Sequence, residues 1–201
     1  LHGEGLRELG WGRPTRGAAV AVASGRPWGF LHEVAEQLGV LRYAVLSNGA
    51  AVLDVHTGEW LYRNCLPEET RQALTELLLE EGVPFEVYCE GESWIQRDRL
   101  EGVLAHTFSP EFRQVLREHA RLPEELNAAL RGRMAEKFHI FYVLPQRRKS
   151  LMERAAACGA LEMVTSFAEN LEFTAAGVNK GTAVQALSAR LGLGPEQVMA
   201  F

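Results

Sequence analysis

Cysteine is rare in this sequence, and long apolar runs are absent. The three cysteines, Cys65, Cys89 and Cys158, lie far apart and form no C-x-x-C pair, so the pattern favours neither a disulfide framework nor a zinc ribbon. No apolar run approaches the roughly 20 residues that span a bilayer, and residues 1–17 contain no apolar signal-peptide core. These absences predict a soluble, unexported protein in a reducing, cytoplasmic setting, with no membrane partner.

The chain also lacks an excess of positive charge. It has 21 Lys and Arg residues against 26 Asp and Glu residues, a formal net charge of −5, whereas nucleic-acid binders usually carry a basic stripe. We therefore expect no nucleic-acid partner, and we interpret the short basic cluster at 147–149 as a solvated turn at a helix start. No metal-ligand spacing relates the six histidines, and we interpret them as surface residues or as residues with satisfied hydrogen bonds. They are His2, His32, His56, His106, His119 and His139.

What is present suits a folded α/β protein. With 201 residues, of which 47% are hydrophobic, the chain can bury one large core or two small ones. The unbroken apolar run at 18–23 predicts a buried parallel strand, followed by a helix from Pro27 to Gly39. A second strand over 43–46 runs into Ser47-Asn48-Gly49, and a hairpin follows over 51–63.

After Leu66 the pattern changes to short helices and strands, in the order of a small α+β unit inserted into the chain. From residue 171 the first pattern returns, with an amphipathic helix over 180–191 and an apolar run at 198–201 that predicts the start of another buried strand. We divide the chain into 1–65 as the first part of a core, 66–168 as an α+β cap, and 169–201 as the second part of the core. Within the cap the sequence predicts helices over 67–82, 109–121, 123–132 and 148–157, and strands over 85–89, 93–96, 138–143 and 161–165.

Three segments carry candidate chemistry. In Ser24-Gly25-Arg26-Pro27, a hydroxyl and backbone N–H groups follow a strand and open a helix, where an anion is favoured. The plain alternative is a turn that uses Ser as a cap and Gly for its backbone freedom. In Ser47-Asn48-Gly49, the Asn48 amide could reach the same sheet edge, although an ordinary turn explains the segment equally well.

The third segment places Lys180 at the start of a helix. A cation there opposes the helix dipole unless an anion accompanies it, so Lys180 hints at a phosphate ligand. The order Lys-Gly-Thr at 180–182 does not match a P-loop. An ordinary surface lysine is the alternative.

In order and spacing, the three segments resemble the motifs of the Cof-like phosphatases of the haloacid dehalogenase (HAD) superfamily. VASGRP (22–27) looks like the second motif, LSNGA (46–50) like a characteristic loop, and LEFTAAGVNKGTAV (171–184) like the third motif. The resemblance implies a doubly wound parallel, Rossmann-like core with an inserted α+β cap. The cap position fits the Cof-like group better than a phosphomutase.

The resemblance also implies a function and roles for residues. The family hydrolyses a small phosphorylated metabolite, such as a sugar phosphate, through an aspartyl-phosphate with Mg²⁺, and we expect a monomer or homodimer. Ser24 and the Gly25 amide would hold the phosphoryl group, Lys180 would neutralise its charge and orient the nucleophile, and Asn48 would line the substrate entrance, with Arg26 as a further candidate. On the cap, Tyr88, Glu90 and Trp94 are candidates for the face toward the site.

The aspartates of that chemistry are missing from the sequence. The family's D-x-D-G-T segment precedes the second motif, but nothing upstream of Ala18 is aspartate, and the chain has only Asp54 and Asp98. The family's metal-binding G-D-x-x-N-D segment would follow residue 201. Two explanations stay open: an incomplete copy of an active phosphatase, which the stop within a predicted strand favours, or a catalytically dead remnant that binds a phosphate ligand or a protein. In either case we expect these 201 residues to be inactive.

Overall fold

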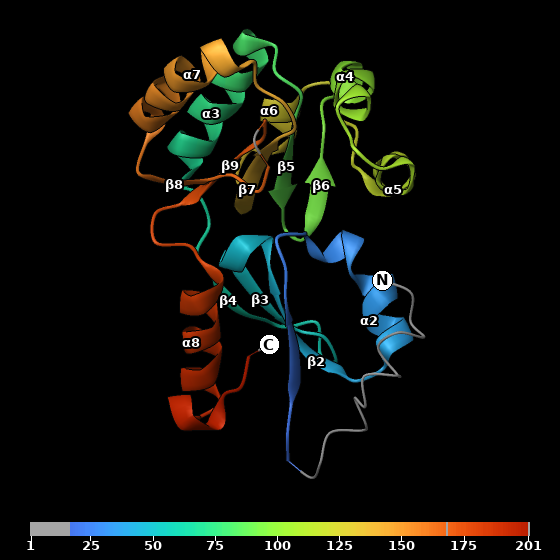
Figure 1. Ribbon diagram of the computed structural model, residues 1–201, viewed down its shortest axis with the longest axis vertical. Coiled ribbons are helices and arrows are strands. Elements are labelled where there is room, and N and C mark those ends of the chain that lie inside the picture. The colour runs from blue at the N-terminus through green and yellow to red at the C-terminus, as the bar shows by residue number, and fades with distance from the viewer. Residues whose placement is uncertain (1–16, 168, 201) are drawn as a thin grey trace.

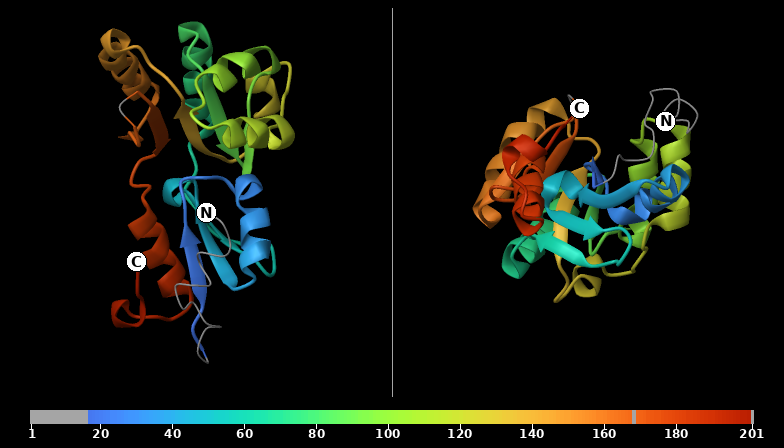
Figure 2. Two further views of the ribbon diagram at one scale, coloured as in Figure 1. Left: turned by 45° about the vertical axis from the view of Figure 1, so that its right-hand side comes forward. Right: turned by 90° about the horizontal axis from the view of Figure 1, so that it is seen from below.

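The computed structural model describes residues 17–167 and 169–200. The chain forms two parts stacked along the long axis, one built on a four-stranded sheet and the other on a five-stranded sheet (Figure 1). We call the four-stranded part the core and the five-stranded part the cap. The left view of Figure 2 shows the same stacking after a turn of 45°. The signal-peptide prediction and His2 concern the segment 1–16, which lies outside the described residues.

The core sheet starts with a parallel strand pair. β1 (Val20–Ala23) pairs parallel with β2 (Leu41–Leu46), and the sheet continues antiparallel through β3 (Ala51–Asp54) and β4 (Trp60–Arg63). Between β1 and β2 the chain forms a 3-10 turn, η1 (Trp28–Phe30), and then α2 (His32–Leu38), which ends at Gly39 in the left-handed conformation. Glycine ends this helix because its lack of a Cβ removes the penalty for a positive φ.

Helices cover both faces of the core sheet. On one face, Ala183 and Leu187 of α8 (Lys180–Arg190) pack with Val45 and Val52. On the other face, Trp28 and Leu31 pack with a cluster formed by Ala44, Leu46 and Leu53. The predicted α/β class is confirmed, with a parallel unit and helices on both sides.

Two predicted buried strands differ in the structure. The residues of β1 alternate between half-buried and exposed, because within the described chain β1 is an edge strand that pairs only with β2. Residues 198–200 form no strand but follow a 3-10 turn, η4 (Pro195–Gln197), and the Met199 side chain is 78% exposed. An apolar sequence becomes a buried strand only where a neighbouring strand completes its hydrogen bonds.

The cap contains most of the predicted elements, with shifted ends. The helix predicted over 123–132 shortens to four residues, because the Pro123 carbonyl accepts from the Arg97 N–H rather than from a helical partner. The strand predicted over 138–143 begins and ends three residues earlier. Pro84 stands opposite Phe141 and accepts from its N–H, but proline has no N–H to donate in return, so the strand pairing ends there. The cap helices are α3 (Glu68–Glu81), η3 (Arg97–Arg99), α4 (Leu100–Ala105), α5 (Pro110–His119), α6 (Leu126–Ala129) and α7 (Pro145–Cys158), and its strands are β5 (Phe85–Cys89), β6 (Glu92–Trp94), β7 (Ala135–Ile140), β8 (Leu161–Val164) and β9 (Leu171–Ala175), in the order β6-β5-β7-β9-β8.

The two faces of the cap sheet differ in polarity. Side chains alternate across a strand, so the sequences FEVYC, KFHI (137–140) and LEFTA each send apolar and polar residues to opposite faces. The apolar face packs beneath α3 and α7 as the cap core, with Val87, Phe138 and Phe173 at its centre. The opposite face forms two rows across β5, β7 and β9, which are Glu86–His139–Glu172 and Tyr88–Lys137–Thr174.

The return from cap to core comes later than predicted. The second part of the core was expected to begin at residue 169, but β9 (171–175) lies between β7 and β8 in the cap sheet. Leu171, Phe173 and Ala175 complete the apolar face of that sheet, which explains this placement. The chain enters the core again only at α8.

Two short linkers, 64–67 and 176–179, connect the core and the cap. They lie side by side, because the Asn64 side-chain amide donates a hydrogen bond of 3.3 Å to the Ala176 carbonyl (Figure 1). Leu66, within the first linker, donates its N–H to Ala135 at the start of β7. The two crossings of the chain between core and cap therefore lie next to each other.

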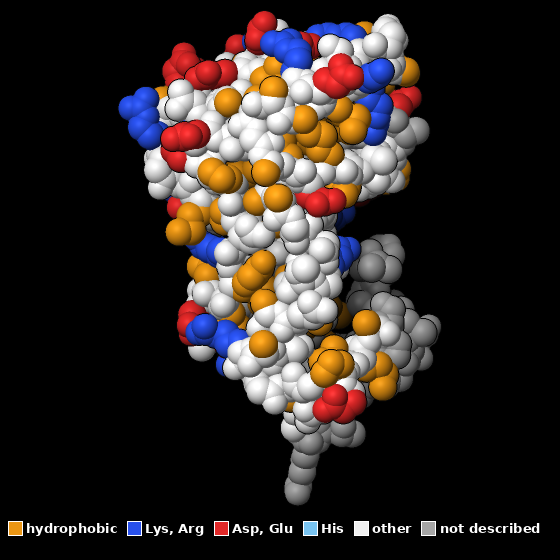
Figure 3. All heavy atoms as spheres, turned by 90° about the vertical axis from the view of Figure 1, so that its left-hand side faces the viewer, with side chains coloured by type: hydrophobic (Ala, Val, Ile, Leu, Met, Phe, Trp, Pro, Cys, Tyr) orange, Lys and Arg blue, Asp and Glu red, His pale blue; other side chains and the backbone are white. Residues whose placement is uncertain are grey.

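The outer surface of the cap mixes both signs of charge (Figure 3). The basic cluster at 147–149 lies in the first turn of α7, and the Arg147 guanidinium pairs with Glu81 at the end of α3. Arg154 lies about two turns further along the same side of α7, and its guanidinium is 2.9 Å from the Glu80 carboxylate. No helix in the described ranges is both long and apolar enough to cross a membrane.

Candidate functional site

A cavity of about 410 Å³ opens between the core and the cap. This volume lies in the range of small-molecule sites. From the core it is lined by Gly25, Arg26, Asn48 and Lys180. From the cap it is lined by the polar residues Tyr88, Thr107, Ser109, Lys137, His139, Ser166, Asn170 and Glu172, and by the rings of Phe108, Phe112, Phe141 and Phe167.

Two loops of the core meet at one edge of the sheet. The loop after β1 carries Gly25 and Arg26, and the loop after β2 forms a 3-10 turn, η2 (Ser47–Gly49). Because β1 and β2 are parallel, their carboxyl ends lie at the same edge. Hydrogen bonds join the loops there: the Ser47 N–H donates to the Arg26 carbonyl (3.0 Å) and the Asn48 N–H to the Ser24 carbonyl (3.1 Å).

Glycine is required where these loops approach their neighbours. A Cβ on Gly25 would lie 2.6 Å from the side-chain oxygen of Asn48. A Cβ on Gly49, whose φ is 105°, would lie 2.2 Å from the Asn179 carbonyl oxygen at the start of α8. The segment that carries Lys180 therefore packs directly against the Ser47-Asn48-Gly49 loop, which brings Lys180 to the edge that carries Gly25 and Asn48.

Lys180 is the first residue of α8 and lines the cavity with an exposed side chain. Asn179 caps the helix: its side chain accepts from the Thr182 N–H (2.9 Å), while the Thr182 hydroxyl accepts from the Asn179 N–H. The capping residues occupy part of the helix terminus, so the positive charge of Lys180 stands beside the cavity without an acidic residue in the first turn. This arrangement favours an anion.

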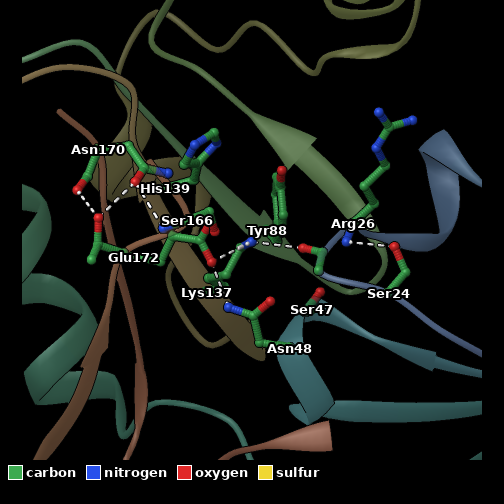
Figure 4. A network of polar contacts seen from close by, with 12 residues as sticks. Ser24, Arg26, Ser47, Asn48, Tyr88, Lys137, His139, Ser166, Asn170 and Glu172 are labelled. Carbon is green, nitrogen blue, oxygen red and sulfur yellow. Dashed lines mark hydrogen bonds and ion pairs between the residues drawn. The ribbon is translucent and has the colours of Figure 1, made fainter. Parts of the chain in front are cut away.

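Ser24 is close to the cavity but does not line it. Its hydroxyl oxygen accepts from the Arg26 N–H at 3.1 Å within its own loop (Figure 4). Such a bond is what the plain turn interpretation of the segment predicts. Of the five predicted site residues, Gly25, Arg26, Asn48 and Lys180 thus share one cavity, and Ser24 supports the loop behind it.

A buried lysine of the cap reaches the core loop. The side chain of Lys137 is 2% exposed, and its ammonium lies 2.6 Å from the Gly25 carbonyl oxygen and 3.3 Å from the Glu172 carboxylate (Figure 4). It also lies 4.6 Å from the centre of the Tyr88 ring. Burial lowers the pKa of Lys137, and nearby Lys180 lowers it further, while Glu172 acts in the opposite direction.

Glu172 joins the two parts of the molecule. Its carboxylate accepts from the Asn48 amide of the core (2.5 Å), from the Ser166 hydroxyl (2.9 Å) and from Lys137. Burial alone would raise the pKa of Glu172, but the charge of Lys137 and the hydrogen bonds from Asn48 and Ser166 outweigh it, and the pKa is lowered. The carboxylate therefore stays ionised beside the buried ammonium.

A second polar cluster lies further along the same face of the sheet. The Glu86 carboxylate is fully buried and accepts from the Tyr88 hydroxyl (2.9 Å) and from Ser93, and it lies 2.9 Å from Nδ1 of His139. Burial and the Glu86 charge raise the pKa of Tyr88 well above its ordinary value. Tyr88 therefore stays a neutral hydrogen-bond donor.

Sequence reasoning identified Tyr88 as facing the site, but it missed Lys137, His139 and Glu172. The available signal was the polar residue at every second position of KFHI (137–140) and of LEFTA (171–175), whose other residues are apolar. Glu90 and Trp94, the other two cap candidates, do not line the cavity.

The carboxylates of the described chain do not form a metal site. Asp54 ends β3 at the far edge of the core sheet, where it pairs with Arg42 at 2.7 Å, and Asp98 lies in the turn η3 of the cap. Within residues 17–167 and 169–200, no group of three or more His, Cys, Asp or Glu side chains could hold a metal ion. The cavity instead presents Lys137, Lys180 and Arg26, which suit an anionic ligand.

Comparisons with known proteins concern the fold and the family of this chain. No curated protein matches the chain. Among solved structures it is similar to a sugar phosphatase of HAD subclass IIB (17% identity, TM-score 0.68, covering 90% of this chain and 66% of that one). It is also similar to a haloacid dehalogenase-like hydrolase from Bacteroides thetaiotaomicron (18%, 0.72, 91% and 68%) and to a HAD/COF-like hydrolase from Plasmodium vivax (17%, 0.68, 98% and 67%).

The chain spans about two thirds of the length of these structures. At such identities the likeness concerns the fold, which they share with the core and cap described above. A model of the haloacid dehalogenase-like hydrolase family matches residues 14–201, which include all three motif-like segments. The chain therefore belongs to the haloacid dehalogenase-like hydrolases, in agreement with the Cof-like resemblance of its motifs.

Proposed function

We propose that this protein binds a small phosphate monoester between core and cap, and that its family activity is the hydrolysis of that ester. One observation carries the proposal: Gly25, Arg26, Asn48 and Lys180, from three separate segments, line one cavity of small-molecule size. Sugar phosphates are the first class to consider, because a structurally similar protein is a sugar phosphatase.

The core residues divide the work of binding the phosphoryl group. Lys180 and Arg26 supply positive charge, and the backbone N–H of Gly25 supplies a donor of fixed direction. Phosphoryl transfer depends mostly on positioning and on charge stabilisation, which such groups provide. Asn48 lines the cavity where the core meets the cap, and its side-chain amide donates a hydrogen bond to Glu172 of the cap. Ser24 would contribute indirectly, because its hydroxyl accepts from the Arg26 N–H and so holds the loop that carries Gly25 and Arg26.

The residues present do not fit the magnesium of the family reaction. Mg²⁺ takes hard oxygen ligands and usually one or two carboxylates, but the carboxylate that lines the cavity, Glu172, is bound to Lys137. An aspartyl-phosphate also needs an aspartate, and neither Asp54 nor Asp98 lines the cavity. These features favour a second candidate function, in which the 201 residues bind the phosphate ligand without turning it over.

Calorimetric titration of the 201-residue chain with inorganic phosphate tests the proposal. We expect Lys180→Ala to weaken binding about tenfold or more, because a charge-assisted hydrogen bond contributes about 1.5–3 kcal/mol. Lys149→Ala removes an equal charge from the exposed start of α7 and is the matched control. Absence of phosphate binding by the unmodified chain, or equal binding by Lys180→Ala, would contradict the proposal.

A further inference from the structure

Two phenylalanines stand exposed at the mouth of the cavity. Phe108, between α4 and α5, is 69% exposed, and Phe167, between β8 and β9, is 61% exposed. Their ring centres are 5.4 Å apart with the planes tilted by 46°. Two separate loops thus bring large apolar rings together where water still reaches both of them.

Aromatic rings continue into the cavity. Phe141 is 4% exposed, and its ring centre lies 4.3 Å from that of His139. The guanidinium of Arg26, from the core, lies 5.4 Å from the centre of the Phe112 ring. The aromatic side chains therefore extend from the mouth to Arg26, one of the two cations proposed to bind the phosphoryl group.

The polar groups of the floor are already engaged with one another. Glu172 accepts hydrogen bonds from Asn48, Ser166 and Lys137, and Lys137 also donates to the Gly25 carbonyl. The side-chain oxygen of Asn170 accepts from the Ser166 and Phe167 N–H groups (3.0 and 2.9 Å). A carboxylate has about four acceptor positions, so Glu172 has about one left for a ligand hydroxyl, and a polyhydroxylated ligand would find few free partners on this floor.

We infer that the leaving group of the ester is a planar aromatic ring, bound against Phe108 and Phe167 with its phosphate directed to Lys180 and Arg26. This inference rests on the proposed phosphate-monoester site, and within the phosphate monoesters it favours aryl phosphates over the sugar phosphates that the similar structure suggests. Planar rings stack on phenylalanine in offset or edge-on geometries, and exposed apolar rings beside a polar pocket mark a ligand groove. A cavity of about 410 Å³ accommodates a ring system of small-molecule size rather than a polymer.

The test compares ligands that differ in the leaving group alone. The 201-residue chain is titrated calorimetrically with inorganic phosphate, phenyl phosphate, cyclohexyl phosphate and glucose 6-phosphate. Cyclohexyl and phenyl groups have equal numbers of carbons, so general apolar burial favours both, whereas stacking favours the planar ring. We expect phenyl phosphate to bind about two- to tenfold tighter than cyclohexyl phosphate or glucose 6-phosphate.

The double variant Phe108→Ala/Phe167→Ala is expected to lose that preference and to bind inorganic phosphate as the unmodified chain does. Both side chains are exposed, so its thermal stability should change little. Leu144→Ala removes another exposed apolar side chain of the cap, 40% exposed and outside the cavity lining, and serves as the control.

The outcomes separate the inference from the function beneath it. Inorganic phosphate binding with no phenyl preference, or a preference that the double variant keeps, overturns the aromatic leaving group alone. Failure of every ligand to bind overturns the phosphate site and the inference together. Sedimentation showing an oligomer that the double variant dissociates would assign the two rings to contact between copies and would also overturn the inference.

Discussion

The Lys137 ammonium and the Glu172 carboxylate lie 3.3 Å apart with side chains that are 2% and 8% exposed, and both belong to the cap although each also contacts a loop of the core. Charges enclosed to this extent are tolerated only when they are paired. The pair lies on the face of the cap sheet that lines the cavity, and the hydrogen bond from Lys137 to the Gly25 carbonyl holds the core loop against that face.

We expect Glu172→Gln to lower the free energy of unfolding by about 3–5 kcal/mol, because it leaves a buried ammonium without a counter-charge. Lys137→Met should lose less, since Asn48 and Ser166 still donate to the remaining carboxylate. The double variant should lose clearly less than the sum of the two. Urea unfolding measures all three, and strictly additive losses would show that the pair is not coupled.

Lys149→Met provides the comparison for that cycle. Lys149 lies 3.9 Å from Glu153 on α7, with side chains 89% and 67% exposed. An ion pair in water contributes little, so this variant should unfold at the same urea concentration as the unmodified chain.

The buried Glu136 carboxyl predicts a pH dependence of stability. Burial raises its pKa above the ordinary value of 4.5, although hydrogen bonds from Ser47 (2.6 Å) and the Gly91 N–H (2.9 Å) oppose part of the shift. The folded chain then holds this proton to higher pH than the unfolded chain. The stabilisation is complete below the unfolded pKa and is lost as the pH rises through the folded pKa.

Glu136→Gln should therefore gain stability relative to the unmodified chain as the pH rises above about 4.5. Denaturant unfolding from pH 4 to pH 8 measures the difference between the two. Glu162→Gln, at an exposed position of β8, controls for the change in net charge. A constant difference across this range would mean that the pKa of Glu136 is the same in both states.

Gly49→Ala should destabilise the protein by about 2 kcal/mol or more. The new Cβ would clash with the Asn179 carbonyl, and the φ of 105° is unfavourable for alanine. Gly102→Ala is the control, because a Cβ there meets nothing within 4 Å and alanine favours the α4 helix. If Gly49→Ala folds, its weakened phosphate affinity should report the displacement of Lys180. Full stability and full affinity would show that the loop and α8 need not touch.

We expect no release of phosphate by the 201-residue chain from sugar or nucleotide monophosphates, with or without Mg²⁺. No carboxylate among the described residues stands in the cavity without a cationic or hydrogen-bonding partner to serve as nucleophile. In the described part of the chain the Ser24 hydroxyl accepts from the Arg26 N–H and has no base beside it. A colorimetric phosphate assay over such a panel measures this. Turnover that disappears in Ser24→Ala would point to a serine nucleophile and would contradict the present account.

Local signals in the sequence predicted the elements that depend on local chemistry. α3 begins after Pro67 and ends at Gly82, whose φ is 65°, and the β3–β4 hairpin and α8 also lie where the sequence places them. Proline, glycine and a capping asparagine act within a few residues, so their effects can be read along the chain.

Long-range pairing explains what the sequence did not reveal. The segment LEFTA was assigned to the core because the first sequence pattern returns at residue 171, but the strand that it forms pairs with β8 and with β7, more than thirty residues earlier. Only the order β5-β7-β9 aligns Glu86, His139 and Glu172 in one row, so the polar floor of the cavity could not be assembled from any single segment. The four-residue β1 looked buried because its apolar composition does not report how many neighbours a strand has.

The hydrogen bond from Asn64 to Ala176 has a kinetic consequence. Because the two linkers lie side by side, we expect the cap to swing about the line that they define. On the side of α2 and α5, away from the linkers in Figure 1, the rings of Phe30 and Phe112 pack edge to face with their centres 5.5 Å apart. Such a swing would separate these rings and expose them to water, so any ligand entry that depends on it must break this contact. Solutes that strengthen apolar burial, such as sucrose, should therefore slow ligand entry in stopped-flow measurements while leaving the closed geometry of the cavity unchanged.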